Sequence, residues 1–220
     1  MPLKAVLFDM DGVIVDTEPL HRKAYYKMFD DLGISVDEDL YTSFTGSSTK
    51  KVCETLVGTF SLEETHEQLA ARKRSYFKHY FDNDPNFNLL PGVFDLIQHY
   101  HQNDITLILA SSAHNNTINW VFDKFNLHPY FKAKISGAEL KESKPHPEIF
   151  VRAAELAETP IRQCLVIEDS TNGIAAAHAA GIFCAAYKSP HSLGQNYEKA
   201  NIIVEQFEEL NLDKINAYFE

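Results

Sequence analysis

The composition of this chain is that of an ordinary soluble globular protein. It has 220 residues, of which 45% are hydrophobic and 23% are charged, fractions that exclude a disordered or fibrous chain. Its 20 lysine and arginine residues against 31 aspartate and glutamate residues give a formal net charge of −11. Because binding to a nucleic-acid backbone needs a clustered positive surface, we expect no nucleic-acid partner.

The cysteines and the apolar runs bear on the cellular compartment. Cys53, Cys164 and Cys184 are too few and too scattered for a disulfide framework or a zinc ribbon. No stretch approaches the roughly 18 uninterrupted apolar residues of a membrane-spanning helix, and Asp9 interrupts the first apolar run before a signal-peptide core forms. We therefore expect a reduced, cytoplasmic protein with no membrane partner, and its acidic surface is compatible with a monomer.

Short apolar runs alternate with helical stretches along most of the chain. Runs typical of parallel strands covered on both faces span residues 5–8, 105–110, 164–167 and 182–186. Weaker strand candidates span residues 133–135 and 202–204. Apolar residues at helical spacing predict helices over residues 92–100, 116–125, 147–157 and 172–180. This alternation predicts an α/β fold with a doubly wound parallel sheet, which keeps its ligands at the carboxyl ends of its strands.

One interval interrupts the alternation. From about residue 17 to residue 89 the pattern is helical, with no convincing strand. We expect helices over residues 18–32, 49–58 and 62–80, and then a turn-rich stretch at 81–86. Residues 17–87 would form a helical cap domain over the strand ends, and residues 1–16 and 88–220 would form the core.

Two carboxylates follow the first predicted strand. Asp9 and Asp11 are two residues apart, so in an extended chain both side chains project to one side. Two such charges repel unless a proton or a cation separates them, and a hard cation such as Mg²⁺ is their natural companion. Gly12 allows a sharp turn and offers an unobstructed N–H to an anion. An isolated Asp-Gly pair more often marks only a turn, so the interpretation depends on the other strand ends.

The later strands are followed by side chains of complementary chemistry. Ser111 and Ser112 precede a helix, where hydroxyl and N–H groups bind phosphate, although serine is also a common helix cap. Lys144 stands in a proline-flanked loop whose stiff backbone can aim its ammonium group. Considered without the other strand ends, this stretch would indicate only a solvated surface lysine. Glu168 and Asp169 end a buried strand, and the desolvation cost of two acids there favours a metal site.

These side chains supply what phosphoryl transfer requires: a nucleophile, an acid/base, a metal site and cations for the transferred oxygens. The segments that carry them are residues 8–13, 110–112, 144–148 and 168–170. In residue type and order they resemble the haloacid dehalogenase-like hydrolase superfamily, in the branch of β-phosphoglucomutase and small sugar-phosphate phosphatases. The resemblance implies a Rossmann-like catalytic core with a helical cap inserted after the first strand.

The resemblance also implies a role for each matching residue. Asp9 would be the nucleophile that forms an aspartyl-phosphate, and Asp11 would be the general acid/base. Ser111 and Lys144 would bind the phosphoryl oxygens. Dehalogenases of the superfamily lack an acid at the position of Asp11, so halide displacement is not expected.

The same resemblance implies Mg²⁺ as the cofactor. Asp9, the backbone carbonyl of Asp11 and Asp169 would hold the ion. Glu168 would be a further ligand or a neighbour that acts through water.

The segment of residues 17–87 bears on the choice between two activities. In the mutase branch a histidine, an arginine and a lysine of the cap engage the substrate. His21 matches the histidine and Lys73 the lysine. A packed helix residue explains His21 equally well, and a solvated helix face explains Lys73 better than a ligand role does. Thr49 stands where the arginine is expected, and a threonine holds a distal phosphate less well than a bidentate arginine does. We therefore expect a phosphatase of a small phosphorylated metabolite, with β-phosphoglucomutase as the alternative.

A non-catalytic phospho-acceptor module, such as a response-regulator receiver, is a third possibility. Receivers also carry acids, a hydroxyl and a lysine at the strand ends of a doubly wound sheet. They are shorter, however, and their phospho-acceptor stands in the middle of the chain, whereas Asp9 ends the first strand. A helical insertion that encloses a small substrate and excludes water favours an enzyme.

Overall fold

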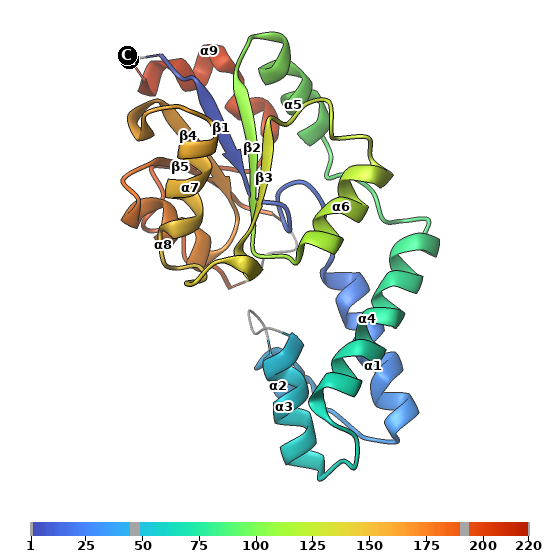
Figure 1. Cartoon of the computed structure of the whole chain (residues 1–220). Coiled ribbons are helices and arrows are strands. Elements are labelled where there is room, and N and C mark those ends of the chain that lie inside the picture. The colour runs from blue at the N-terminus through green and yellow to red at the C-terminus, as the bar shows by residue number, and fades with distance from the viewer. Residues whose placement is uncertain (1, 45–48, 190–193, 220) are drawn as a thin grey trace. The chain divides into compact units, whose positions relative to one another are not determined.

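The structure is a computed structural model that describes residues 2–44, 49–189 and 194–219. The chain divides into two compact units (Figure 1). Met1–Asp16 and Asn88–Glu220 form one, called here the sheet unit, and Thr17–Phe87 form the other, called the helical unit. Within the described residues, no helix combines the length and the apolar character needed to cross a membrane.

The sheet unit is built on a parallel sheet of six strands in the order β3-β2-β1-β4-β5-β6. The strands are β1 (Ala5–Phe8), β2 (Thr106–Ser111), β3 (Ala133–Ser136), β4 (Cys164–Glu168), β5 (Phe183–Tyr187) and β6 (Ile202–Val204). The chain winds outward from β1 to β3 and then returns to β4 on the other side of β1, so the sheet is doubly wound. This confirms the predicted α/β fold and the two weaker strand candidates.

The register places the ends of three neighbouring strands at one level. Phe8 of β1 pairs with Leu109 of β2 and with Ile167 of β4. The residues that follow these three therefore emerge side by side at the carboxyl edge of the sheet. This edge is where ligands bind in doubly wound folds.

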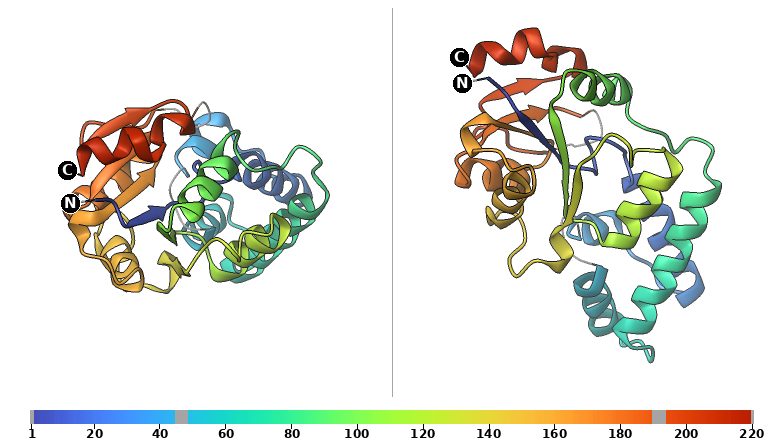
Figure 2. Two further views of the ribbon diagram at one scale, coloured as in Figure 1. Left: turned by 90° about the horizontal axis from the view of Figure 1, so that it is seen from above. Right: turned by 45° about the horizontal axis from the view of Figure 1, so that its top comes forward.

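Helices cover both faces of this sheet (Figures 1 and 2). They are α5 (Val93–Gln102), α6 (Asn115–Lys124), α7 (Glu148–Leu156), α8 (Thr171–Ala179) and α9 (Leu212–Ile215), with short 3₁₀ turns at Gly137–Glu139, Ile161–Gln163, Phe207–Leu210 and Asn216–Tyr218. Side chains alternate along β1, so Leu7 packs in the cluster that contains Phe150 of α7. Phe8 points to the other face, where its ring lies 6.4 Å from that of Tyr100 of α5. Each fully buried side chain of this kind contributes roughly 1.5–3 kcal/mol to folding.

The helical unit consists of α1 (Glu18–Leu32), α2 (Glu38–Thr42), α3 (Thr49–Phe60) and α4 (His66–Asn83). The helical character predicted for this interval is therefore confirmed, but one helix was not predicted and both ends of α4 differ from the expected ones. The short helix α2, capped by the Asp37 side chain on the N–H of Leu40, was not predicted. Helix α4 begins at His66 rather than at residue 62, because Thr65 and Gln68 form a reciprocal capping box there. It also continues into the stretch expected to be a turn, to Asn83.

Candidate active site

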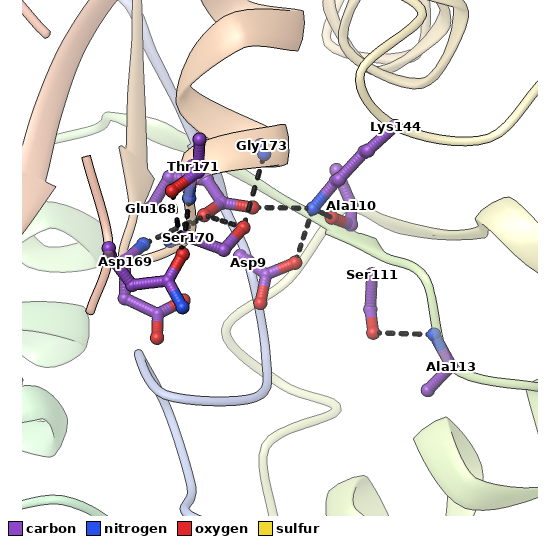
Figure 3. A network of polar contacts seen from close by, with 11 residues as sticks. Asp9, Ala110, Ser111, Ala113, Lys144, Glu168, Asp169, Ser170, Thr171 and Gly173 are labelled. Atoms are coloured by element: carbon purple, nitrogen blue, oxygen red, sulfur yellow. Dashed lines mark hydrogen bonds and ion pairs between the residues drawn. The ribbon is translucent and has the colours of Figure 1, made fainter. Parts of the chain in front are cut away.

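Three strand ends supply acceptors to one ammonium group. Asp9 directly follows β1, Ala110 is the last residue but one of β2, and Glu168 ends β4. Lys144 Nζ lies 2.5 Å from Asp9 Oδ1, 2.9 Å from Glu168 Oε1 and 3.1 Å from the Ala110 carbonyl oxygen (Figure 3). The predicted lysine and two of the predicted acids are therefore brought together by the register of the sheet.

Lys144 reaches this position from the loop before α7. Its side chain is only 6% exposed, its peptide bond to Pro145 is cis, and its Nζ lies 4.9 Å from the centre of the Phe150 ring. Burial lowers the pKa of the Lys144 ammonium, but the carboxylates of Asp9 and Glu168 outweigh it, so the pKa lies above its usual value. Lys144 thus stays charged, and its charge is balanced inside the site.

Asp9 is surrounded by more negative than positive charge. Burial raises the pKa of the Asp9 carboxyl well above its usual value, and Glu168, Asp169 and Asp11 raise it further. Lys144 acts in the opposite direction. A second cation beside these acids would relieve the repulsion between them.

Glu168 is held by donors on both carboxylate oxygens. Its Oε1 accepts from Lys144. Its Oε2 accepts from the N–H of Asp169 at 2.8 Å, the N–H of Ser170 at 2.7 Å and the hydroxyl of Ser170 at 2.9 Å. A Cβ placed on Gly173 of α8 would lie only 1.6 Å from Oε1. The absence of a side chain at Gly173 is what lets the helix approach this carboxylate.

The chain leaves β1 in a tight turn, not in the extended form expected for residues 9–11. The Met10 carbonyl accepts N–H bonds from residues 13–15, and the Gly12 N–H donates to the Val15 carbonyl at 2.7 Å. The expectation that Gly12 offers an unobstructed N–H to an anion is therefore wrong. Gly12 has φ +81°, and a Cβ there would lie 2.1 Å from Asp169 Oδ2. Glycine is needed for this turn and for the close approach of the Asp169 carboxylate.

The donors around this turn suit a hard cation. The Asp169 carboxylate lies against the backbone at Gly12, and both Asp169 and Asp11 lie near enough to raise the pKa of Asp9. Carboxylate and carbonyl oxygens with a net negative charge are the donors that Mg²⁺ prefers. Across the described ranges, no group of three or more His, Cys, Asp or Glu side chains is arranged to hold a metal. The ligand set expected from the sequence differs from such a group of side chains, because it includes the backbone carbonyl oxygen of Asp11.

The two predicted serines differ in their surroundings. Ser111 is fully buried at the end of β2, and its Oγ accepts the N–H of Ala113 at 3.0 Å. It directly follows Ala110, whose carbonyl accepts from Lys144. Ser112 is exposed. Of the two hydroxyls, that of Ser111 adjoins the Lys144 site.

His21 and Lys73 lie in the helical unit, where α1 and α4 bring them into contact. Lys73 Nζ lies 2.6 Å from His21 Nδ1 and 4.7 Å from the centre of the Tyr25 ring. The His21 ring stacks on Phe77 with a centroid distance of 4.3 Å. Burial, and then the charge of Lys73, lower the pKa of His21 well below its usual value. The matched histidine and lysine therefore form one pair, with His21 neutral.

Sequence reasoning missed two contributors to the sheet-unit site. The Ala110 carbonyl left no signal, because any residue carries such an oxygen. Gly173 did leave one, since an interior glycine costs about 1 kcal/mol in a helix and usually has a packing reason. The loop expected to precede α3 includes residues 45–48, which lie outside the described residues.

Comparisons with known proteins identify the family of this chain. The profile of the family described as haloacid dehalogenase-like hydrolase matches residues 6–187. A phosphorylated carbohydrates phosphatase of Thermotoga maritima is 31% identical over 180 residues, which cover 82% of each chain. The β-phosphoglucomutase of Bacillus subtilis is 29% identical over 224 residues, covering 99% of this chain and 96% of that protein. A crystal structure of CbbY from Rhodobacter sphaeroides in complex with phosphate has a TM-score of 0.82 at 25% identity, covering 96% of this chain and 99% of that one.

The family match spans most of the chain, and its range contains every strand end that meets at Lys144. The relatives include both a phosphatase of phosphorylated carbohydrates and a β-phosphoglucomutase. The chain therefore belongs to the haloacid dehalogenase-like hydrolase superfamily, in the branch of β-phosphoglucomutases and small sugar-phosphate phosphatases.

Proposed function

We propose that this protein is a Mg²⁺-dependent phosphatase that hydrolyses a small phosphorylated metabolite, such as a sugar phosphate, through an aspartyl-phosphate on Asp9. The observation that carries the proposal is the buried Lys144 ammonium, bound to both Asp9 and Glu168 at the level ends of parallel strands. The Thermotoga maritima relative, which is named for phosphorylated carbohydrates, supports this substrate class. We further propose a monomer that works in the cytoplasm.

The first chemical step is assigned to Asp9. Lys144 holds Oδ1, so we assign the attack on phosphorus to Oδ2. The bond between phosphorus and the leaving oxygen breaks, and Asp11 donates a proton to that oxygen. In the second step Asp11 takes a proton from water as the water attacks the aspartyl-phosphate, which releases inorganic phosphate and regenerates the Asp9 carboxylate.

The remaining residues bind and orient. Lys144 and the Ser111 hydroxyl are assigned to the phosphoryl oxygens, where a fixed cation and a donor stabilise the charge of the transition state. Asp9, Asp169 and the Asp11 carbonyl are assigned to Mg²⁺, which when bound neutralises phosphoryl charge and the excess negative charge of the acids. Glu168, with protein donors on both oxygens, is assigned to orienting Lys144, with any contact to the metal made through water.

β-Phosphoglucomutase activity is the second candidate. Two observations favour it: the Bacillus subtilis relative covers 99% of this chain, and His21 contacts Lys73, the two residues that match substrate-binding positions of the mutase branch. Thr49 in place of the expected arginine argues against a firm hold on the second phosphate. We therefore place hydrolysis first.

One incubation separates the candidates. The purified protein is given β-glucose 1-phosphate with a trace of the bisphosphate, and other sugar phosphates in parallel, with Mg²⁺ or with EDTA. We expect free phosphate as the main product, its release stopped by EDTA and restored by added Mg²⁺. Glucose 6-phosphate as the main product would assign the mutase activity. If neither the sugar phosphates nor a chromogenic phosphate ester turned over with Mg²⁺, the non-catalytic phospho-acceptor module would be the better description.

The role of Asp11 predicts a dependence on the leaving group. Asp11→Asn should slow hydrolysis of a sugar phosphate by roughly 10²–10⁴-fold, because an alkoxide needs a proton to leave. The loss should be smaller for a nitrophenyl ester, whose leaving group needs no acid in the first step. Steady-state kinetics with both substrates test this, and equal losses on the two would remove Asp11 from the first step.

A further inference from the structure

The turn after β3 bonds to the loop after β2. Ser136, the last residue of β3, pairs in register with Ser111 and is 3% exposed. Its hydroxyl donates to the Ala113 carbonyl at 2.6 Å. The Ala113 N–H in turn donates to Ser111 Oγ at 3.0 Å. A chain of hydrogen bonds thus runs from Ser136 through the backbone of Ala113 to the Ser111 hydroxyl.

Two further contacts join the same segments. A Cβ on Gly137 would lie 3.3 Å from Ser112 Cα and 3.4 Å from the Ser111 carbonyl oxygen, so the two backbones pack closely here. The Asn115 side-chain amide donates to Glu139 Oε1. Residues 136–139 therefore contact the loop of residues 111–115 at three points.

The bond from the Ala113 N–H limits which way the Ser111 hydroxyl points. A hydroxyl has one hydrogen to donate and two lone pairs that accept. Because the oxygen of Ser111 accepts from Ala113, its hydrogen is directed away from that N–H and is available to another acceptor. The position of the Ala113 N–H, and hence this orientation, depends on what holds Ala113.

We propose that Ser136 is a positioning residue: by holding the Ala113 carbonyl it orients the Ser111 hydroxyl for donation to a phosphoryl oxygen. The inference rests on the proposed function, which assigns Ser111 to the phosphoryl group. It adds a residue of β3, a strand that supplies none of the side chains assigned above.

The test compares Ser136→Ala with a matched control, Thr159→Val. The hydroxyl of Thr159 also donates to a backbone carbonyl, that of Ala157 at 3.1 Å, but it precedes β4 and so lies toward the opposite edge of the sheet. The measurements are the inhibition constant of inorganic phosphate, its affinity by calorimetry with Mg²⁺, and kcat and KM for a sugar phosphate. Ser136→Ala should weaken phosphate binding about fivefold, the effect of about one neutral hydrogen bond. It should raise KM more than it lowers kcat, while Thr159→Val stays within about twofold of wild type.

A double-mutant cycle separates positioning from general structural support. In a Ser111→Ala background, Ser136→Ala should change phosphate affinity by less than about twofold, because the group that it orients is gone. Gly137→Ala provides a second variant that keeps the Ser136 hydroxyl but presses on Ser112, and it should also weaken phosphate binding.

The outcomes distinguish this inference from the proposed function. Full additivity in the cycle, or a Ser136→Ala variant whose phosphate affinity equals that of Thr159→Val, would overturn the positioning role. Unchanged phosphate affinity in Ser111→Ala would overturn both the assignment of Ser111 and the inference. A further outcome is that the two substitutions weaken phosphate binding non-additively while the protein hydrolyses no ester. In that case the positioning role of Ser136 would stand and the proposed function would fail.

Discussion

The sheet unit and the helical unit each bury the side chain of a lysine, and they compensate its charge in different ways. The side chain of Lys144 is 6% exposed and is bound by two carboxylates and a carbonyl. Lys73 is 3% exposed, and its Nζ contacts the imidazole of His21 and lies over the rings of Tyr25 and Phe77. Two carboxylates bind the first ammonium, and a neutral imidazole and two aromatic rings are among the neighbours of the second.

The difference shows what each environment does to a buried charge. Two carboxylates raise the pKa of Lys144 and tie it to the acids, so its removal leaves those acids without their cation. Aromatic faces attract a cation by roughly 0.5–2 kcal/mol without neutralising it. Lys73 instead lowers the pKa of its neighbour His21. Lys144 is therefore part of a charge network with the acids, whereas Lys73 acts on the protonation of its neighbour His21.

The largest expected effect is the loss of turnover when Asp9, one of the two carboxylate partners of Lys144, is replaced. Asp9→Asn should reduce turnover by about 10⁴-fold or more, because an amide of the same shape is not a nucleophile. Lys144 keeps Glu168 as its carboxylate partner, so we expect the fold to persist. Single-turnover assays for phosphoenzyme, with circular dichroism on the same sample, test both parts. Retained turnover would remove Asp9 from the mechanism.

A matched pair of substitutions tests the comparison of the two lysines directly. Lys144→Met should lower turnover by about 10²–10³-fold and destabilise the protein by about 3–5 kcal/mol, because two buried carboxylates lose their cation. Lys73→Met should cost less stability than Lys144→Met, because contacts of Lys73 to rings and to an imidazole are weaker than two buried ion pairs, and it should raise KM for a sugar phosphate.

Urea unfolding in EDTA measures these stabilities without a contribution from bound Mg²⁺. Equal losses of stability in Lys144→Met and Lys73→Met would show that the carboxylates around Lys144 do not need their cation. The two buried lysines would then contribute equally to stability, whatever their neighbours.

A pair of glycine substitutions acts on the network of Lys144 without removing a charge. Gly173→Ala places a methyl group where Glu168 Oε1 lies, so it should cost about 1–3 kcal/mol and also reduce turnover by displacing the partner of Lys144. Gly58→Ala, in α3 of the helical unit, meets nothing within 4 Å and should stabilise the protein by up to about 1 kcal/mol. Thermal unfolding and kinetics of both variants test this, and a Gly173→Ala variant as active and stable as wild type contradicts it.

The smallest effect is a dependence of stability on pH that involves His21. The pKa of His21 is lowered below its ordinary value of 6.5 in the folded protein, so below pH 6.5 the unfolded chain binds a proton that the folded chain does not. Stability should therefore fall as the pH drops below 6.5, by at most about 1.4 kcal/mol per pH unit from this group. His21→Gln should reduce this slope, as measured by urea midpoints between pH 5.5 and 7.5. Lys73→Met should also reduce it, because the charge of Lys73 contributes to the shift; identical slopes in all three proteins would contradict the assignment.

Local sequence patterns predicted helices and strands well where a single signal, such as an apolar run, is present. Uninterrupted apolar runs identified β1, β2, β4 and β5, because burial on both faces leaves a clear signal. The edge strands β3 and β6 are partly exposed and gave only weaker candidates. The start of α4 was misplaced, because the Thr65–Gln68 capping box overrode the apolar spacing that began earlier. The turn after β1 was misjudged for a related reason: alternation assumes an extended chain, and Gly12 at φ +81° ends it.

The sequence by itself determined that acids, hydroxyls and a lysine follow strands of one parallel sheet, because strand periodicity and the positions of polar residues are local properties. Only the tertiary structure decided which atoms meet. The register of β1, β2 and β4 sets Asp9, Ala110 and Glu168 at one level for Lys144. Likewise the helical unit brings His21 of α1 against Lys73 of α4. Contacts between residues 24 to 135 positions apart depend on register and packing, which no short stretch of sequence encodes.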